Sequence, residues 1–396
     1  MKLMSVAAAR QAMLAEIQPA GLETVGLAQA IGRVLGEDVT ALRDQPPFTN
    51  SAMDGWALRA SDTPARLEII GESAAGHGFP GQVEAGQAVR IFTGAALPTG
   101  ADTVVIQEDA ERDGQTVRIP LTPPGENIRK AGRDFHAGDS LLQAGLRIDP
   151  WRLSLCASAG RAEVKVRKRP SVAVLSTGEE IVEAPAQPGP FQIYDSGSPA
   201  LVAMIESWGG VATKRSGIGD RLEAVVSAMS EAQGDIVVTV GGASVGDHDL
   251  VRTAAAQLGL TLKVESVAVR PGKPTFFGVL GDGRLLLGLP GNPASAFVCA
   301  ELFLRPMMSA WCGAAGEPGM VRTRLDGALS ANGPREHWMR ARLVPGENGL
   351  MAQPFGDQDS SLVTVFAGAD ALLRRMPHAP AAGRGDLVDI LVLNRG

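Results

Sequence analysis

A glycine-rich segment follows the apolar run DIVVTV at residues 235–240 and is the strongest local signal for chemistry. The segment, GGASVG, is expected to join a buried strand to a helix. Glycines let backbone N–H groups form an anion-binding nest at such a junction, and the helix dipole also favours phosphate there. A tight turn without a ligand is the alternative. The predicted phosphate-binding residues are Gly241, Gly242, Ser244 and Gly246.

Hydroxyl and carboxylate groups follow a second apolar run in the same region. The run VAVLST ends in Ser176 and Thr177, and Glu180 comes three residues later. If this run is a strand of a parallel sheet, these side chains lie at the carboxyl edge, where open α/β sheets bind their ligands. We therefore predict that this loop and the glycine-rich segment serve one site.

Prolines stiffen two further loops. RPGKP presents Arg270 and Lys273, which suit a phosphate or another oxyanion, although a solvated basic turn is the alternative. LPGNP contributes a rigid turn in which Pro290, Asn292 and Pro293 position backbone groups rather than donate protons. Several such loops from one sheet favour a phosphate-bearing ligand over the ligand-free alternative.

The N-terminal half offers three isolated candidates. Asp54 lies in the turn NSAMDGWA, Thr93 in the bend FTGAALPTG, and Asp134 in GENIRKAGRD. Charged and hydroxyl-bearing turn residues are usually only solvated, so these residues alone do not indicate a site.

The elements that must position these loops differ along the chain. Residues 1–45 have helical periodicity, first from Val6 to Ile17 and again from Leu22 to Leu35, and 139–168 include a helical stretch at 150–160. We expect these two segments to form a helical linker domain. Residues 46–138 are short alternating runs divided by glycine and proline, which predict an inserted β module.

Strands and helices alternate regularly in residues 169–313, so a doubly wound α/β domain with a parallel sheet is predicted there. Residues 314–396 have short strand-like runs between turns, which indicate a small β-barrel. The predicted fold class is therefore a multidomain α/β and β protein of four structural units.

Composition limits the possible functions. The chain has 396 residues, 45% hydrophobic and 20% charged, and a net charge of -6, which disfavour a nucleic-acid-wrapping or membrane-spanning protein. The three cysteines form no CxxC pair, and the five histidines lack metal-ligand spacing. We therefore expect a soluble protein of the reducing cytoplasm, without a zinc site.

The motifs NSAMDGWA, FTGAALPTGADTVV, GENIRKAGRD, STGEE, GGASVGDHD, RPGKP and LPGNP resemble, in order, those of the MoeA and gephyrin E-domain family. The resemblance implies a homodimer of four-domain subunits, with the α/β domain binding the pterin and the partner's β module completing the cleft. It implies insertion of molybdenum from molybdate into adenylyl-molybdopterin with release of AMP, assisted by Mg²⁺. The upstream molybdopterin adenylyltransferase and the acceptor molybdoenzymes are the expected protein partners.

Carried over residue by residue, the resemblance assigns roles to positions of this sequence. Lys273 binds substrate, and Glu180 and Asp249 are the expected magnesium ligands. Arg340 and Ser360 are candidates for contacts with molybdate or the cofactor, since an arginine fork and a hydroxyl suit a tetrahedral oxyanion; a surface residue without such a role is the alternative for each. The expected catalytic residues are Asp54, Thr93, Asp134, Glu180, Asp220 and Asp249.

The sequence departs from the family pattern at three positions. Arg133 stands in GRD where an acidic residue is frequent, Thr49 replaces a common aspartate, and Gly197 stands where asparagine is frequent.

Two other functions are alternatives to the molybdenum transferase. The related adenylyltransferase lacks the N-terminal β module, whose motifs are present here. A non-catalytic scaffold that clusters a membrane receptor, as gephyrin does, is disfavoured by the retained charged loop residues.

Overall fold

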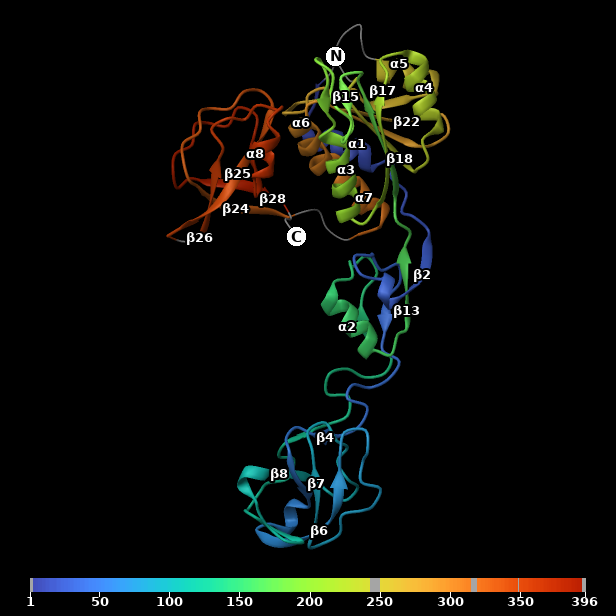
Figure 1. The fold of residues 1–396 in the computed structure, drawn as a ribbon. Helices are drawn as coiled ribbons and strands as arrows, with labels where there is room; N and C mark the ends of the chain where they lie inside the picture. The colour runs from blue at the N-terminus through green and yellow to red at the C-terminus, as the bar shows by residue number, and fades with distance from the viewer. Residues whose placement is uncertain (1–2, 243–249, 315–318, 348, 394–396) are drawn as a thin grey trace.

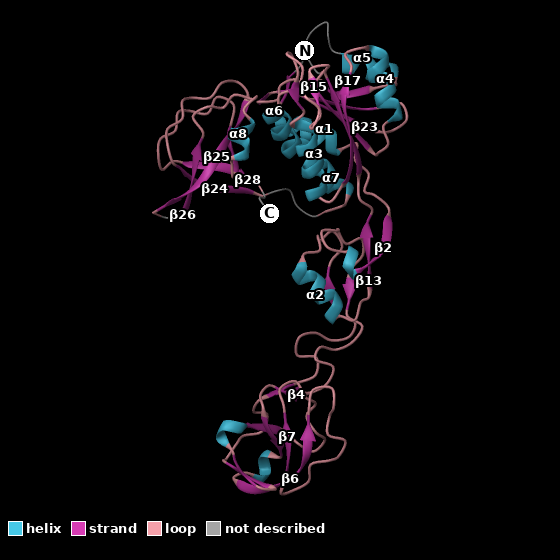
Figure 2. Ribbon diagram, in the orientation of Figure 1, coloured by secondary structure: helices cyan, strands magenta, loops and turns pink. Residues whose placement is uncertain are grey.

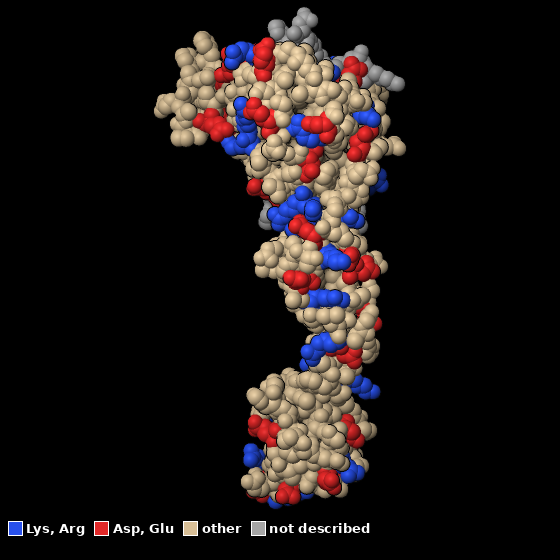
Figure 3. All heavy atoms as spheres, turned by 90° about the vertical axis from the view of Figure 1, so that its right-hand side faces the viewer, with Lys and Arg blue, Asp and Glu red and all other residues tan. Residues whose placement is uncertain are grey.

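The chain is elongated in the computed structural model, which describes residues 3–242, 250–314, 319–347 and 349–393. An α/β unit and a β-barrel lie side by side at one end, and a β module lies at the other (Figure 1). A narrow linker, crossed twice by the chain, joins the two ends, and the molecule is also narrow between its ends in the space-filling view of Figure 3. Among the described residues, no helix combines the length and apolar character needed to cross a membrane.

A mixed six-stranded sheet forms the α/β unit. Its central strands are parallel, and the strands β22 and β19 extend it on one side. The strand order is β17 (Val211–Ile218), β14 (Ser171–Thr177), β18 (Ile236–Val240), β23 (Leu285–Leu289), β22 (Phe276–Val279), β19 (Thr261–Val264). Helices cover both faces, which explains why β14, β18 and β23 are continuous apolar runs. The predicted doubly wound domain is confirmed.

Two groups of helices bury the two faces of this sheet. One apolar cluster includes residues of the sheet together with α1, α3, α6, the π-helical η4 and α7, and the other includes α4 and α5. The bounds are α1 (Val6–Leu14), α3 (Gly197–Ser207), α4 (Leu222–Glu231), α5 (Leu250–Gln257), α6 (Pro293–Cys299), η4 (Ala300–Leu304) and α7 (Arg305–Trp311). The N-terminal helix thus packs on the α/β unit, and β1 (Leu3–Met4) pairs with β20 (Ser266–Val267) there.

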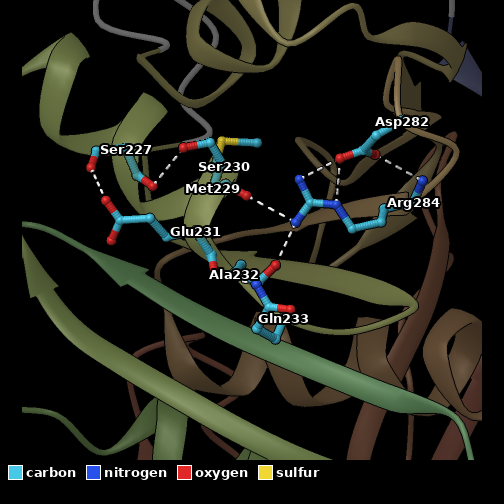
Figure 4. Close-up of polar contacts among 8 residues, drawn as sticks. All are labelled: Ser227, Met229, Ser230, Glu231, Ala232, Gln233, Asp282 and Arg284. Atoms are coloured by element: carbon cyan, nitrogen blue, oxygen red, sulfur yellow. Dashed lines mark hydrogen bonds and ion pairs between the residues drawn. The ribbon is translucent and has the colours of Figure 1, made fainter.

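Arg284 fixes the end of α4 to the turn between β22 and β23 (Figure 4). Its guanidinium donates to the carbonyls of Met229 at 3.0 Å and Ala232 at 2.6 Å, and it pairs with Asp282 at 2.7 Å. Carbonyls at the end of a helix lack partners within the helix, so this arginine satisfies them. The α4 helix is therefore held against the sheet.

The linker contains more strand than predicted. The expected second helix over Leu22–Leu35 is wrong, because β2 (Leu22–Gly26) pairs with β13 (Glu163–Arg167) and only the short 3-10 turn η1 (Leu27–Gln29) follows. Gly32 has φ +74°, a left-handed conformation that interrupts a helix. β3 (Val39–Thr40) pairs with β12 (Ser140–Leu142), and α2 (Pro150–Ser158) is the predicted helix. The predicted domain boundaries stay predictions.

The β module consists of short strands and loops with only short helical turns, as Figure 2 shows. Its strand order is β8 (Thr103–Ile106), β5 (Gly55–Leu58), β7 (Gln87–Ile91), β6 (Ala65–Ser73), β10 (Thr116–Ile119), β9 (Glu111–Asp113). The helical turns are η2 (Ala60–Asp62) and η3 (Gln107–Asp109), and β4 (Asn50–Ser51) pairs with β11 (Ile128–Arg129) near the linker. Trp56, Leu67 and Val117 lie in its apolar core.

Five strands of the C-terminal unit close into the predicted barrel. They follow the order β25 (Glu336–Gly346), β26 (Gly349–Pro354), β24 (Met320–Leu325), β28 (Leu387–Val392), β27 (Ala371–Arg375), and β27 pairs back to β25. β21 (Val269–Arg270) pairs with the start of β25, and α8 (Val363–Ala367) packs against α6. The barrel is therefore attached to the α/β unit at the RPGKP loop.

Candidate functional site

A cavity of about 480 Å³ opens at the carboxyl edge of the α/β sheet. The loops that follow β14, β18 and β23 form it because parallel strands bring their carboxyl ends to the same edge, and the RPGKP loop closes one side. The lining residues are Thr177, Gly178, Glu180, Asp220, Gly241, Gly242, Lys273, Pro274, Pro290, Gly291 and Asn292. Eight of the sequence-predicted site residues therefore lie in one place.

Both the backbone conformation and the small space around the two residues after β18 require glycine at these positions. Gly241 and Gly242 have φ values of +86° and +63°, which side-chain-bearing residues rarely adopt. A Cβ on Gly242 would lie 2.6 Å from Val251 Cγ2 and 2.9 Å from Thr177 Oγ1. Consecutive glycines leave the backbone open to a ligand at this turn. Ser244, Gly246 and Asp249, which were predicted to belong to the same site, lie outside the described residues.

Two carboxylates face this cavity. The Glu180 side chain folds back over Gly178, where a Cβ would collide with its carboxylate. Asp220 accepts a weak hydrogen bond from the Glu179 amide at 3.4 Å. Neither Glu180 nor Asp220 forms an ion pair with any described residue, so both have oxygens available for a cation or for an oriented water.

The short parallel pair β15 (Ile181–Val182) and β16 (Ile193–Tyr194) holds the loop that carries Glu180. The Ile193 amide donates to the Glu180 carbonyl at 2.7 Å, and the Gln192 side chain donates to the Glu179 carbonyl at 3.0 Å. The backbone at Glu180 is thus fixed from outside the sheet.

Lys273 provides the positive charge of the cavity. The Lys273 carbonyl accepts from the Val267 amide at 3.1 Å, and the preceding Gly272 carbonyl accepts from the Thr275 hydroxyl at 2.8 Å. These bonds hold the loop, while the half-buried Lys273 side chain forms no ion pair with a described carboxylate. A lysine that has a fixed loop and no counter-ion in the described part of the chain can hold a phosphate.

Asn292 joins the sheet-edge cavity to the barrel. Its amide donates to the Ser360 hydroxyl at 2.8 Å, and the Ala294 amide donates to the Ser360 carbonyl at 3.1 Å. Pro293 is the first residue of α6, which leaves the turn rigid. Ser360 therefore lies beside the cavity, although 68 residues separate it from Asn292.

Arg340 is fully buried between the barrel and the loop that carries Ser360. Its Nη2 donates to the Asp359 carbonyl at 2.8 Å, whereas the buried Nε and Nη1 have no hydrogen-bond partner among the residues that the structure describes. Burial lowers the pKa of Arg340, and the nearby Asp357 and Asp359 carboxylates oppose that effect. A buried guanidinium with free donors is suited to an anion.

Two other predicted residues lie away from the cavity. Ser176 is buried within β14. Arg270 lines a different cavity, of about 450 Å³, at the mouth of the barrel, together with His337 and Arg375. Their predicted contact with substrate stays a prediction.

Asp54 and Thr93 form one unit in the β module. The amide and hydroxyl of Thr93 donate to the same Asp54 oxygen at 2.7 and 2.8 Å. These two bonds lower the pKa of Asp54, the amide bond contributing most, so the carboxylate stays ionised. The pair belongs to the β module, which lies at the opposite end of the molecule from the α/β unit (Figure 1).

Asp134 lines a further cavity, of about 390 Å³, where the β module meets the linker. Asn50, Arg129 and Arg133 line it as well, and sequence reasoning did not select them. The cluster of basic residues in GENIRKAGRD was the available signal, but solvated turns have the same composition. One chain therefore does not bring its two groups of candidate residues together.

Three family descriptions match successive parts of the chain. The MoeA N-terminal region (domain I and II) matches residues 4–160, the probable molybdopterin binding domain 173–310, and the MoeA C-terminal region (domain IV) 322–393. The second of these ranges includes every residue that lines the sheet-edge cavity.

Individual relatives match over most of their length. The chain is 38% identical to the molybdopterin molybdenumtransferase of Nostoc sp., over 82% of this chain and 78% of that protein. It is 30% identical to that of Staphylococcus epidermidis, over 93% and 90%. The crystal structure of the molybdopterin biosynthesis MoeA protein from Pyrococcus horikosii matches with a TM-score of 0.84 and 31% identity, covering 100% of both chains.

Proposed function

The chain belongs to the MoeA family of molybdopterin molybdenumtransferases, and we propose that it inserts molybdenum from molybdate into adenylyl-molybdopterin and releases AMP. The sheet-edge cavity is the observation that carries this proposal. It brings together a turn of two glycines, a lysine and two carboxylates, and these three side chains form no ion pair with any residue that the structure describes. These groups suit a substrate that carries a phosphoanhydride.

We propose that the glycine turn and Lys273 bind the phosphates of the substrate. The Gly241 amide donates to the Leu289 carbonyl at 3.3 Å, so the donors that we propose for the phosphate oxygens are the Gly242 amide and the Lys273 ammonium group. Glu180 and Asp220 lie across the same cavity, on the loops that follow β14 and β17. Their proposed role is to orient the reacting groups at the phosphoanhydride.

Glu180 and Asp220 also fit a magnesium ion. Mg²⁺ is commonly held by one or two carboxylates together with substrate phosphates, and no larger protein cage is required. Among the described residues, no group of three His, Cys, Asp or Glu side chains converges on one point. When bound, Mg²⁺ would neutralise negative charge on the phosphoanhydride. The originally predicted ligand pair of Glu180 and Asp249 stays a prediction.

We propose that molybdate enters beside Arg340 and Ser360. The two free donors of Arg340 and the Ser360 hydroxyl are suited to a tetrahedral oxyanion, and Asn292 links Ser360 to the phosphate-binding cavity. Molybdate held there would be near the pterin of a substrate bound at the sheet edge.

The proposed enzyme is a homodimer whose sites are shared between subunits. Asp54 and Thr93 belong to the β module, and Asp134 lines the cavity where that module meets the linker. The sheet-edge cavity belongs to the α/β unit, which lies at the other end of the chain (Figure 1). A second chain with its β module against that cavity would supply them. We further propose that the enzyme acts in the cytoplasm, and the three buried free thiols suit such a reducing compartment. There it would receive its substrate from the adenylyltransferase and pass its product to acceptor molybdoenzymes.

The direct test is to incubate the purified chain with adenylyl-molybdopterin, molybdate and Mg²⁺ and to measure AMP and molybdenum cofactor. The expected result is equal amounts of both. Glu180→Ala is expected to abolish both without lowering the melting temperature, because this exposed carboxylate adds little to the core. Glu179→Ala is the matched control, since Glu179 is adjacent but does not line the cavity. Unchanged turnover in Glu180→Ala would contradict the assignment.

A further inference from the structure

Arg90 is placed by the two strands of the β module that also lead to Asp54 and Thr93. In the antiparallel pair of β7 and β5, Arg90 is directly opposite Trp56, and directly opposite residues project on the same side of a sheet. Asp54 immediately precedes β5, and Thr93 follows the end of β7. A side chain at position 90 can therefore act on both residues of the Asp54–Thr93 unit.

The Arg90 guanidinium joins two segments of backbone at Asp54. Its Nη1 donates to the Gly55 carbonyl at 3.1 Å, and its Nη2 donates to the Gln107 side-chain oxygen at 2.5 Å. The Gln107 amide in turn donates to the Asp54 carbonyl at 3.0 Å. The planar fork of a guanidinium presents such donors in a fixed geometry, which the ammonium group of a lysine does not. Arg90 therefore fixes the backbone at Asp54 directly and through Gln107.

Two aromatic rings hold the guanidinium in this position. The Arg90 Cζ lies 5.2 Å from the centre of the Trp56 ring and 4.9 Å from the centre of the Phe92 ring. A cation over an aromatic face is attracted by the negative charge of that face. Trp56 belongs to the apolar core of the module, and Phe92 directly precedes Thr93. The rings therefore connect Arg90 both to the core and to the segment that carries Thr93.

The charge of Arg90 acts on Asp54 as well. Its hydrogen bonds go to the uncharged acceptors of Gly55 and Gln107, and it forms no ion pair within the part of the chain that the structure describes. The Thr93 amide and hydroxyl lower the pKa of Asp54 most, and the positive charge of Arg90 lowers it further. Because a guanidinium stays charged, Arg90 favours the ionised form of the Asp54 carboxyl group at every working pH.

We propose that Arg90 is a positioning residue for the reaction, because its fork fixes the backbone at Asp54. It acts through Asp54 and does not contact the substrate. The part of Asp54 in the reaction rests on the proposed function, whereas the contacts of Arg90 do not. Displacement of a reacting group by about 1 Å can lower a rate about a hundredfold. Loss of the bridge is therefore expected to lower kcat.

Two variants of the full-length chain separate the fork of Arg90 from its charge. Arg90→Gln removes both, and kcat is expected to fall about ten- to a hundredfold. Arg90→Lys keeps the charge but not the planar fork, and an intermediate kcat is expected. KM is expected to stay nearly unchanged in both variants, because the residues proposed to bind the substrate phosphates belong to the α/β unit.

Arg112→Gln is the matched control. The Arg112 Cζ lies 5.9 Å from the centre of the same Trp56 ring, but its Nε donates to the Gly114 carbonyl of its own turn at 3.1 Å. Arg112 therefore shares the ring contact of Arg90 and lacks the bridge to Asp54. Wild-type kcat is expected in Arg112→Gln.

Two measurements report on the position of Asp54 without turnover. They are NMR titration of the Asp54 carboxyl group and hydrogen exchange of the Thr93 amide, which donates to Asp54 Oδ1 at 2.7 Å. Arg90→Gln is expected to raise the pKa of Asp54 and to speed exchange at Thr93, because the charge and the bridge are both lost. Arg90→Lys is expected to speed exchange and to keep the pKa of Asp54 low. Arg112→Gln is expected to change neither.

Failure of the positioning role and failure of the proposed function give different results. An unchanged pKa of Asp54 and unchanged exchange at Thr93 in Arg90→Gln would overturn the positioning role, as would wild-type kcat in that variant. A wild-type chain that forms no molybdenum cofactor, yet shows both changes in Arg90→Gln, would refute the proposed function and leave the positioning of Asp54 standing. If Arg90→Gln does not fold, unchanged exchange at Thr93 in Arg90→Lys would overturn the role instead.

Discussion

Replacing Lys273 with alanine is expected to weaken substrate binding far more than folding. Lys273 lines the sheet-edge cavity, and its side chain has no ion pair among the described residues. The loop that carries it is held by backbone bonds, including the one from the Val267 amide to the Lys273 carbonyl at 3.1 Å. Alanine keeps that carbonyl, so the change removes the charge and leaves the loop in place.

The magnitude follows from the kind of contact that is lost. A charge-assisted hydrogen bond to phosphate contributes about 1.5–3 kcal/mol, and about 1.4 kcal/mol is a tenfold change in affinity. The dissociation constant for adenylyl-molybdopterin is therefore expected to rise about ten- to a hundredfold. Glu180 and Asp220 share the cavity and remain in the variant, so their repulsion of the phosphates is no longer offset by Lys273.

Titration calorimetry with adenylyl-molybdopterin at two ionic strengths is the assay. Added salt is expected to weaken binding by the wild type more than by the variant, because the variant has already lost one screened attraction. Lys263→Ala is the control, since this lysine of the same unit pairs with Glu16 at 2.7 Å on the surface. Affinity of Lys273→Ala equal to that of the wild type at low salt would refute the assignment of this loop as the phosphate clamp.

Three other predictions test the structure around the sites. Gly272→Ala is expected to lower the free energy of unfolding by about 1–3 kcal/mol in chemical denaturation, because Gly272 has φ +116° and a Cβ would overlap Cys299 Sγ; an unchanged midpoint would mean that the loop is built differently. Thr93→Val is expected to raise the pKa of Asp54, since it removes the hydroxyl donor and keeps the amide; NMR titration of the carboxyl group measures this, and an unshifted titration would count against the contact. Burial, with nearby arginines, lowers the pKa of His337 from 6.5 to about 4, so the unfolded state takes up a proton first as the pH falls. Stability from this group is present above pH 6.5 and is lost toward pH 4, and His337→Gln is expected to flatten the dependence of melting temperature on pH over that range; equal slopes would refute it.

The sheet-edge site could be predicted because glycine and proline mark the ends of its strands. Gly241, Gly242 and Pro290 each follow a continuous apolar run, and parallel strands bring such ends together. The β module and the barrel were predicted in a similar way, from short strand-like runs in the sequence that turn residues divide. Glycine and proline at such positions indicate which backbone conformation is needed locally, and the folded chain adopts that conformation there.

Other features depend on contacts that no local pattern encodes. The helix expected at Leu22–Leu35 is a strand and a short turn, because pairing with β13 outweighs the helical spacing of its apolar residues. The contact between Asn292 and Ser360 depends on how the barrel sits on the α/β unit. The cavity that Arg133 lines depends on the pairing of β4 with β11, which places Asn50 opposite Arg129.

Mixing two inactive variants tests most directly whether two chains build one enzyme site. Asp54→Ala and Glu180→Ala are each expected to be inactive, and the two chains would be co-expressed with different affinity tags so that mixed dimers can be isolated. If a site takes Asp54 from one chain and Glu180 from the other, a mixed dimer has one intact site of its two, and about half of the wild-type activity per dimer is expected. Formation of molybdenum cofactor and AMP at that level is the predicted result. No activity in purified mixed dimers, with both variant chains folded, would contradict a site shared between subunits.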